Sequence, residues 1–167
     1  MKKTSNDHDE ITQILLRGNS DDIKSTLLDL MHEIEESPAH MELPQSMESI
    51  LDVVARRILE RSWSDEILAT GFFVLGKAVI YPGKIDVAKI ASRIILKVGS
   101  QSEARQILIS IENQFLAGRD MDENAVKFIL EFLRKSPEVW NDDLDLFERV
   151  IEELDERSGT TDPVHHL

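Results

Sequence analysis

The sequence contains no cysteine, and glycine, proline and aromatic residues are scarce. The chain has 167 residues, of which 7 are glycine and 5 are proline, and aromatic residues make up 5%. Without cysteine the protein forms neither disulfide bonds nor thiolate metal sites, which excludes a secreted scaffold built on disulfides. The glycines are never clustered, so the sequence offers neither a P-loop nor a glycine-rich dinucleotide-binding fingerprint.

Signals for strands, for nucleophilic catalysis and for export are also missing. No segment alternates apolar and polar residues between turn dipeptides, so no β-sheet is predicted. There is no G-x-S-x-G nucleophile elbow. The first ten residues, MKKTSNDHDE, lack the apolar core of a signal peptide. We therefore expect a cytoplasmic all-α protein without enzymatic activity, cofactor, metal or membrane partner.

Acidic residues outnumber basic ones, and the excess is uneven. The net charge is -13, which disfavours nucleic-acid binding because that depends on neutralising phosphates. Residues 138–157 hold nine acidic residues against two arginines, whereas residues 46–137 hold 13 basic and 12 acidic residues. The middle of the chain is therefore nearly neutral, and the acidity lies towards the two ends.

The most apolar stretch is ILATGFFVLGKAVI, Ile67–Ile80, whose single charge is Lys77. A helix without a polar face is normally buried on more than one side, so we expect this one to be central. It is shorter than the roughly 20 residues of a membrane span. Ser62 or Ser64 would cap its start, and Tyr81-Pro82-Gly83 would end it. Gly71 and Gly76 lie within it, and we expect them to let a neighbouring helix approach closely.

Apolar residues recur at helical spacing through most of the remaining chain. We expect seven to eight helices in antiparallel hairpins, forming a single domain over residues 8–157. Residues 1–7 and 158–167 are expected to be disordered tails. The predicted inward stripes are Ile11, Ile14 and Leu15; Ile23, Leu27, Leu30, Met31 and Ile34; Met47, Ile50, Leu51, Val54 and Ile58; Val87, Ala91, Ile94, Ile95 and Val98; Ala104, Ile107, Leu108, Ile111 and Phe115; Val126, Ile129, Leu130 and Leu133; and Leu144, Phe147, Val150, Ile151 and Leu154.

Ends are predicted for some of these helices. One helix is expected to run from Ile85 to Val98, with Gly99 following as a left-handed residue. Ser100-Gln101-Ser102-Glu103 has the pattern of a reciprocal capping box for the helix after it.

The middle of the chain shows weak internal similarity. VVARRILERSWSDE (53–66) aligns with IASRIILKVGSQSE (90–103) at an offset of 37 residues, which places Arg56 on Arg93. The segment FILEFLRKS (128–136) follows a further 38 residues on. Over residues 46–155 the pattern resembles the two-helix units of HEAT and armadillo-type repeat proteins, whose period is about 40 residues. The resemblance implies a short α-solenoid with a binding role. A plain helical bundle is the alternative.

A ridge of basic residues is predicted on the equivalent helices of these units. Lys89, Arg93 and Lys97 recur at intervals of four residues, and Arg56, Arg57 and Arg61 occupy the preceding unit. If the units stack, the two rows of cations lie side by side and form a candidate site for an acidic segment of a protein partner. The acidic segment 141–156 is a candidate for a basic partner. It is also a candidate occupant of the ridge, either folded back or supplied by a second copy in a homodimer. An ordinary solvated surface is the alternative for both.

The function that these features favour is protein–protein interaction without catalysis, as in an adaptor, a chaperone or an inhibitor. The alternative is a small helical metal-binding protein or enzyme. Its ligands would be Asp29 and His32, one helical turn apart, with Glu33, Glu36 and His40 close by. Di-iron bundles, however, use a Glu-x-x-His pair twice together with two further glutamates.

Overall fold

The chain is all-helical, as the sequence predicts. The computed structural model describes residues 5–38, 41–135 and 138–159, in which it forms eight α-helices, one short 3-10 helix and no strand. The elements are α1 (Ser5–Arg17), α2 (Ser20–Glu35), α3 (Gln45–Glu60), α4 (Asp65–Ala78), α5 (Val87–Ile94), η1 (Ile95–Lys97), α6 (Gln101–Leu116), α7 (Glu123–Lys135) and α8 (Leu144–Ser158). None of these helices is both long and apolar enough to cross a membrane.

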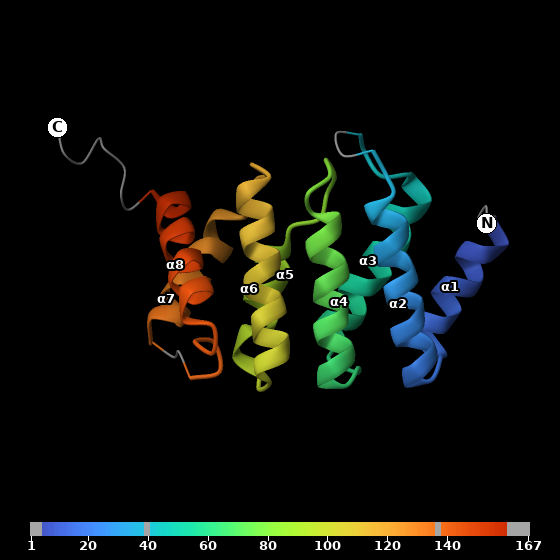
Figure 1. The fold of residues 1–167 in the computed structure, drawn as a ribbon, viewed down its shortest axis with the longest axis horizontal. Helices are drawn as coiled ribbons and strands as arrows, with labels where there is room; N and C mark the ends of the chain where they lie inside the picture. The colour runs from blue at the N-terminus through green and yellow to red at the C-terminus, as the bar shows by residue number, and fades with distance from the viewer. Residues whose placement is uncertain (1–4, 39–40, 136–137, 160–167) are drawn as a thin grey trace.

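The helices form two layers that run side by side (Figure 1). The even-numbered helices α2, α4, α6 and α8 follow one another in one layer, and the odd-numbered helices α1, α3, α5 and α7 lie behind them. Each helix contacts the next helix of its own layer as well as its partner in the other layer. The helices at the two ends of the chain, α1 and α8, therefore lie at opposite ends of the row.

The predicted central helix is α4, which contacts α2, α3 and α6. Its start is fixed by Ser64, whose hydroxyl accepts a hydrogen bond from the Ile67 backbone N–H, so Ser64 is the cap rather than Ser62. Phe72, Val74 and Leu75 are completely buried. At roughly 25 cal/mol per Å² of apolar area, each of these side chains contributes about 1.5–3 kcal/mol through burial.

The most extensive helix–helix contact among the described residues is between α4 and α6, and glycine allows the two helices to approach closely. A Cβ added at Gly76 would lie 2.6 Å from the hydroxyl oxygen of Ser110. That hydroxyl donates to the Phe72 carbonyl at 2.8 Å, and the Asn113 amide donates to the Gly76 carbonyl at 3.0 Å. A Cβ added at Gly71 would lie 3.1 Å from the side chain of Ile58 on α3. The prediction that these glycines admit close neighbours is therefore correct.

The predicted stripes are buried or half-buried with one exception. Leu144 is 55% exposed because it is the first residue of α8, immediately after the cap Asp143. At the other end of the chain, α1 begins at Ser5, within the expected N-terminal tail, and residues 1–4 lie outside the described part of the chain. The helix α8 extends to Ser158, and the rest of the expected tail, residues 160–167, is likewise not described.

The helix predicted over 85–98 is shorter than expected. It begins at Val87, because Asp86 is its N-cap, and changes to a 3-10 turn at Ile95. Gly99 does not adopt the left-handed conformation expected of it. Among the described residues, those that do adopt it at helix ends are Arg61, the C-cap of α3, with φ 60°, Gly118 after α6, with φ 72°, and Gly159 after α8, with φ 78°.

Only half of the predicted capping box at α6 is formed. Ser100 accepts a hydrogen bond from the Glu103 backbone N–H at 3.2 Å. The carboxylate of Glu103 turns away from the helix start and binds the guanidinium of Arg61. Both partners of this ion pair are largely removed from solvent, since Glu103 is completely buried and the Arg61 side chain is 14% exposed.

Candidate functional site

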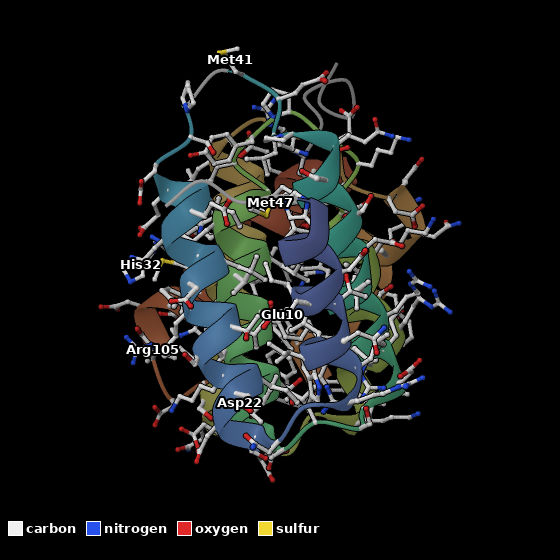
Figure 2. All side chains as sticks on the ribbon, turned by 90° about the vertical axis from the view of Figure 1, so that its right-hand side faces the viewer. Glu10, Asp22, His32, Met41, Met47 and Arg105 are labelled. Atoms are coloured by element: carbon white, nitrogen blue, oxygen red, sulfur yellow. The ribbon has the colours of Figure 1, made fainter. Side chains whose placement is uncertain are left out.

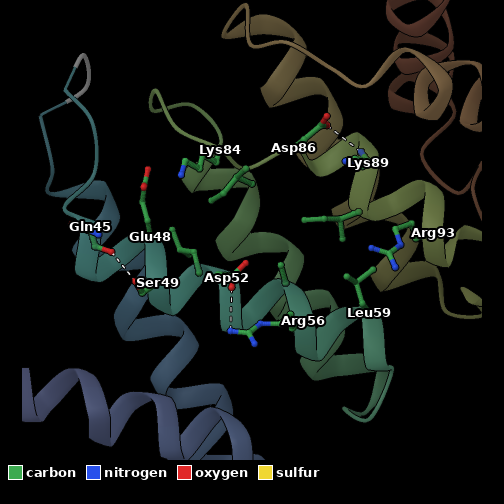
Figure 3. Close-up of a pocket in the computed structure, with 14 residues that line it drawn as sticks. Gln45, Glu48, Ser49, Asp52, Arg56, Leu59, Lys84, Asp86, Lys89 and Arg93 are labelled. Carbon is green, nitrogen blue, oxygen red and sulfur yellow. Dashed lines mark hydrogen bonds and ion pairs between the residues drawn. The ribbon is translucent and has the colours of Figure 1, made fainter.

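A groove lies between α3 and α5 in the odd-numbered layer (Figure 3). In this layer α3 and α5 make fewer contacts than α1 with α3 or α5 with α7, which leaves a space between them. The groove has a volume of about 490 Å³. Its walls and floor mix apolar and charged side chains, namely Gln45, Glu48, Ser49, Leu51, Asp52, Ala55, Arg56 and Leu59 from α3, and Lys84, Ile85, Asp86, Lys89, Ile90 and Arg93 from α5 and the segment before it.

The apolar part of the groove consists of half-buried side chains. Ala55 and Leu59 of α3 face Ile85 and Ile90, and all four also pack against the hydrophobic core. Their remaining exposed surface is an apolar floor that a ligand's side chains can cover, which is favourable by roughly 25 cal/mol per Å² of apolar area removed from water.

Two of the three acidic residues in the groove have other partners. Asp52 pairs with Arg56 one turn away on α3, at 3.1 Å and with both side chains exposed. Asp86 accepts hydrogen bonds from the backbone N–H groups of Lys89 and Asp122 and from the Gln114 amide. A fixed hydrogen-bonding role of this kind leaves Asp86 little capacity to pair with the cations around it.

Unlike Arg56, the cations on the α5 side of the groove have no such partners. Among the described residues from Lys24 onward, every lysine and arginine outside 84–97 pairs with a carboxylate or donates to a backbone carbonyl. Within 84–97 the four cations form no ion pair or side-chain hydrogen bond with any described residue, and all are exposed. They are Lys84, Lys89, Arg93 and Lys97. Arg17 of α1 is the one other cation among the described residues that forms no such bond with a described residue. In a chain of net charge -13, most of the unpaired positive charge of the described residues is thus on one segment.

This basic segment is held in place by a buried amide. Gln114 of α6 is fully buried, and its side-chain oxygen accepts hydrogen bonds from the Val87 and Ala88 backbone N–H groups at 2.9 and 3.2 Å. These are two of the N–H groups that the first turn of a helix leaves without an internal partner. The amide nitrogen of Gln114 donates to Asp86 and to the Asp120 carbonyl. Sequence reasoning missed Gln114, because nothing in its neighbourhood marks it as a cap for a distant helix.

The structure brings together three of the six predicted ridge residues. Arg56, Lys89 and Arg93 all line the groove (Figure 3). Lys97 is exposed in η1, beyond the groove lining. The sequence reading also omitted Lys84, which lines the groove from the loop before α5 and lacks the helical spacing that identified the others.

Arg57 and Arg61 do not belong to the exposed ridge. Arg57 is 19% exposed, pairs with Glu60 at 2.6 Å and lies 6.0 Å from the centre of the Trp63 ring. Arg61 is held by Glu103, and this hydrogen bonding raises the pKa of Arg61 further above its ordinary value. Arg57 follows Arg56 by one position and so lies on a different face of α3, whereas Arg61 lies beyond α3 in the left-handed conformation and reaches Glu103 of α6.

The acidic helix α8 does not fold back onto the basic ridge. It packs against α7 and α6 at the far end of the row from α1 (Figure 1). Arg149, one of the two arginines of α8, binds Glu112 of α6 through two hydrogen bonds of 3.1 Å. The pKa of Glu153 is raised to about 7, mainly by burial and to a smaller extent by the neighbouring Glu112 carboxyl. Exposed acids remain on the outer face of α8, at Asp145, Glu148, Glu152 and Glu156.

The residues of the alternative metal site do not converge. His32 points away from the molecule on the outer side of α2 (Figure 2), and its side chain is 68% exposed. Asp29 is also exposed, and His40 lies outside the described residues. In the part of the chain that the structure describes, no three His, Asp or Glu residues are grouped so that they could hold a metal ion.

Comparisons with known proteins do not assign the chain to a family. No protein family model, no curated protein and no solved structure matches it. The resemblance to HEAT and armadillo-type repeats therefore stays a prediction.

Proposed function

We propose that the protein is a non-enzymatic interaction module that binds an acidic segment of a partner protein in the groove between α3 and α5. The observation that carries this proposal is the concentration of unpaired cations on residues 84–97, beside an apolar floor. Charges of this kind steer the approach of a partner and fix its alignment in the groove, while burial of apolar side chains supplies affinity.

The groove also suits a peptide by its chemistry. Arg56 and Arg93 lie on opposite walls, with Leu59 on the α3 side between them (Figure 3). A bound segment that places an apolar side chain on the floor would thus have a guanidinium on each side. Guanidinium groups bind carboxylates through two parallel hydrogen bonds, which favours aspartate and glutamate in the partner.

A photo-crosslinking experiment tests this proposal. A benzophenone amino acid placed at Ser49, an exposed residue of the groove lining, is expected to crosslink one partner in extracts of the native host. Mass spectrometry should locate the crosslink in a segment rich in Asp and Glu. The same amino acid at Leu116, which is 70% exposed on α6, is the matched control and should not crosslink that partner.

Charge reversal supplies the decisive comparison. Arg56→Glu combined with Arg93→Glu should abolish the Ser49 crosslink, while the helical circular dichroism and the free energy of unfolding stay unchanged within about 0.5 kcal/mol, because exposed charges contribute little to stability. A crosslink that survives the double substitution, or one to a segment without acidic residues, would contradict the proposal.

A further inference from the structure

A second, smaller cleft lies on the other side of α5. It runs between α5 and α7, has a volume of about 270 Å³, and is lined by Lys89, Ser92, Arg93, Asp122, Asn124, Ala125 and Phe128. Phe128 is 44% exposed, which is unusual for a large aromatic side chain in a protein with so few of them. Its exposed ring gives this cleft an apolar surface of its own.

The two clefts share their cations. Lys89 and Arg93 line both the α3–α5 groove and the α5–α7 cleft, so they form a basic crest along α5 with an apolar surface on either side. The one acid of the second cleft, Asp122, accepts a hydrogen bond from the Ala125 backbone N–H at 2.9 Å and caps the start of α7. As with Asp86 in the first groove, this bond occupies a carboxylate that could otherwise neutralise the crest.

From this arrangement we infer that the bound acidic segment crosses α5 and occupies both clefts. This inference rests on the proposed function and adds the sequence pattern of the partner. One apolar side chain lies on Leu59 and Ile90 in the α3–α5 groove, and a second lies against Phe128 in the α5–α7 cleft. Carboxylates between the two apolar side chains pair with Lys89 and Arg93.

The width of α5 sets the spacing between the two apolar side chains of the partner. Neighbouring helices lie about 8–10 Å apart, so the two clefts that flank α5 are separated by about 10 Å. An extended peptide in the polyproline II conformation advances about 3.1 Å per residue with three residues per turn, so about three residues cover this distance and keep both apolar side chains on one face. A helical peptide advances about 1.5 Å per residue and needs about seven residues. The pattern is therefore apolar–acidic–apolar, with one of these two spacings.

Selection from a phage-displayed library of random 16-residue peptides tests the inference on the full-length chain. The enriched peptides are expected to carry Asp or Glu between two apolar residues at one of the two spacings. For the tightest peptide, isothermal titration should show binding lost with Lys89→Glu and Arg93→Glu combined. Affinity should fall about five- to tenfold with Phe128→Ala, and also with Leu59→Ala. Leu116→Ala, which removes an exposed leucine elsewhere, should change affinity less than twofold.

The outcomes separate this inference from the function on which it rests. Acidic peptides that are weakened by Leu59→Ala but not by Phe128→Ala would overturn the inference and leave the proposed function intact. If Leu59→Ala destabilises the chain, Arg56→Glu, at an exposed position, reports on the same groove. If acidic peptides are not enriched, or if their affinity is unchanged by the charge reversals at Lys89 and Arg93, both the inference and the proposed function are overturned.

Two further measurements decide between occupants of different kinds. A 16-nucleotide single-stranded DNA should bind more weakly than the selected peptide by at least tenfold. Equal affinity, lost with the same substitutions, would overturn the inference in favour of nucleic acid. Light scattering of the unliganded chain should show one species whose mass is unchanged by the two charge reversals. An oligomer that they dissociate would identify a second copy as the occupant and overturn the inference.

Discussion

Arg61 and Glu103 are 42 residues apart in the chain and form an ion pair through two hydrogen bonds, one of them 2.8 Å long. The carboxylate is completely buried, and the arginine caps the end of α3 in the left-handed conformation. The pair therefore joins the end of α3 to the first turn of α6. It is the most buried of the ion pairs between described residues.

Removing the arginine should destabilise the protein strongly. Arg61→Gln leaves the Glu103 carboxylate buried without its cation, and loss of one partner of a buried pair costs about 3–5 kcal/mol. Urea unfolding followed by circular dichroism measures this loss. Arg56→Gln breaks the exposed pair with Asp52 and is the matched control, with an expected cost below about 1 kcal/mol. If Arg61→Gln and Glu103→Gln together cost as much as the sum of the single changes, the two residues are not coupled.

Gly76→Ala should also destabilise the protein, although alanine favours helix over glycine by about 1 kcal/mol. The added methyl group would lie 2.6 Å from the Ser110 hydroxyl and 3.2 Å from its Cα, and it would push α6 away from α4. Overpacking of this kind costs roughly 1–3 kcal/mol, so we expect a net loss of about 1 kcal/mol in thermal or urea unfolding. Gly99→Ala has open space around the new methyl group and should leave stability unchanged or slightly raised.

Gln114→Leu should loosen the start of α5. The substitution keeps a similar volume but removes the acceptor for the Val87 and Ala88 N–H groups and the donor to Asp86. Each buried group left without a partner costs about 1–3 kcal/mol. Hydrogen exchange should speed up at Val87 and Ala88 before it changes in α4. Uniform acceleration across the molecule would show that Gln114 does not act locally on α5.

Stability should depend on pH through Glu153. Its pKa is about 7 in the folded protein against an ordinary value of 4.5, so the folded state binds more protons over that range. The free energy of unfolding therefore falls as the pH rises from about 4.5 to about 7 because of this group. After allowance for solvent screening we expect Glu153→Gln to raise stability at pH 8 by about 1 kcal/mol and to flatten this fall.

The control for this pH effect is Glu148→Gln, at an exposed position on the same helix. It should leave the pH dependence of urea unfolding as it is in the unmodified chain. The prediction for Glu153 fails if the two variants behave alike.

Periodicity predicted most of the helical fold. The spacing of apolar residues identified the buried face of each helix, because a helix that packs on one side must repeat its apolar residues every three to four positions. It failed at Leu144, since this leucine is the first residue of α8 and the first residue of a helix need not face the core. It also missed the change to a 3-10 turn at Ile95, which no residue type marks.

The candidate site was only partly predictable, because sequence spacing assigns residues to a helix face but not to a neighbour. Arg56 and Arg93 were expected on one surface because they align in the internal similarity of the sequence, and both line the α3–α5 groove. Arg61 has the same residue type but is directed to Glu103 by the left-handed end of α3. The amide of Gln114 holds the start of α5 by accepting hydrogen bonds from Val87 and Ala88, which lie 27 and 26 residues earlier in the chain. Only the folded structure reveals these contacts.

The middle of the row has one tight edge and one open edge. On one side α4 and α6 are held together at Gly76 and Ser110, and on the other α3 and α5 leave a groove. Densely packed contacts resist deformation, so if the row of helices bends, the contact between α4 and α6 should act as the hinge. The spacing between α3 and α5 would then change most. A ligand bound between α3 and α5 would therefore stiffen the whole molecule against bending. Conversely, a force applied between α1 and α8 would change the width of the groove without any contact to its residues.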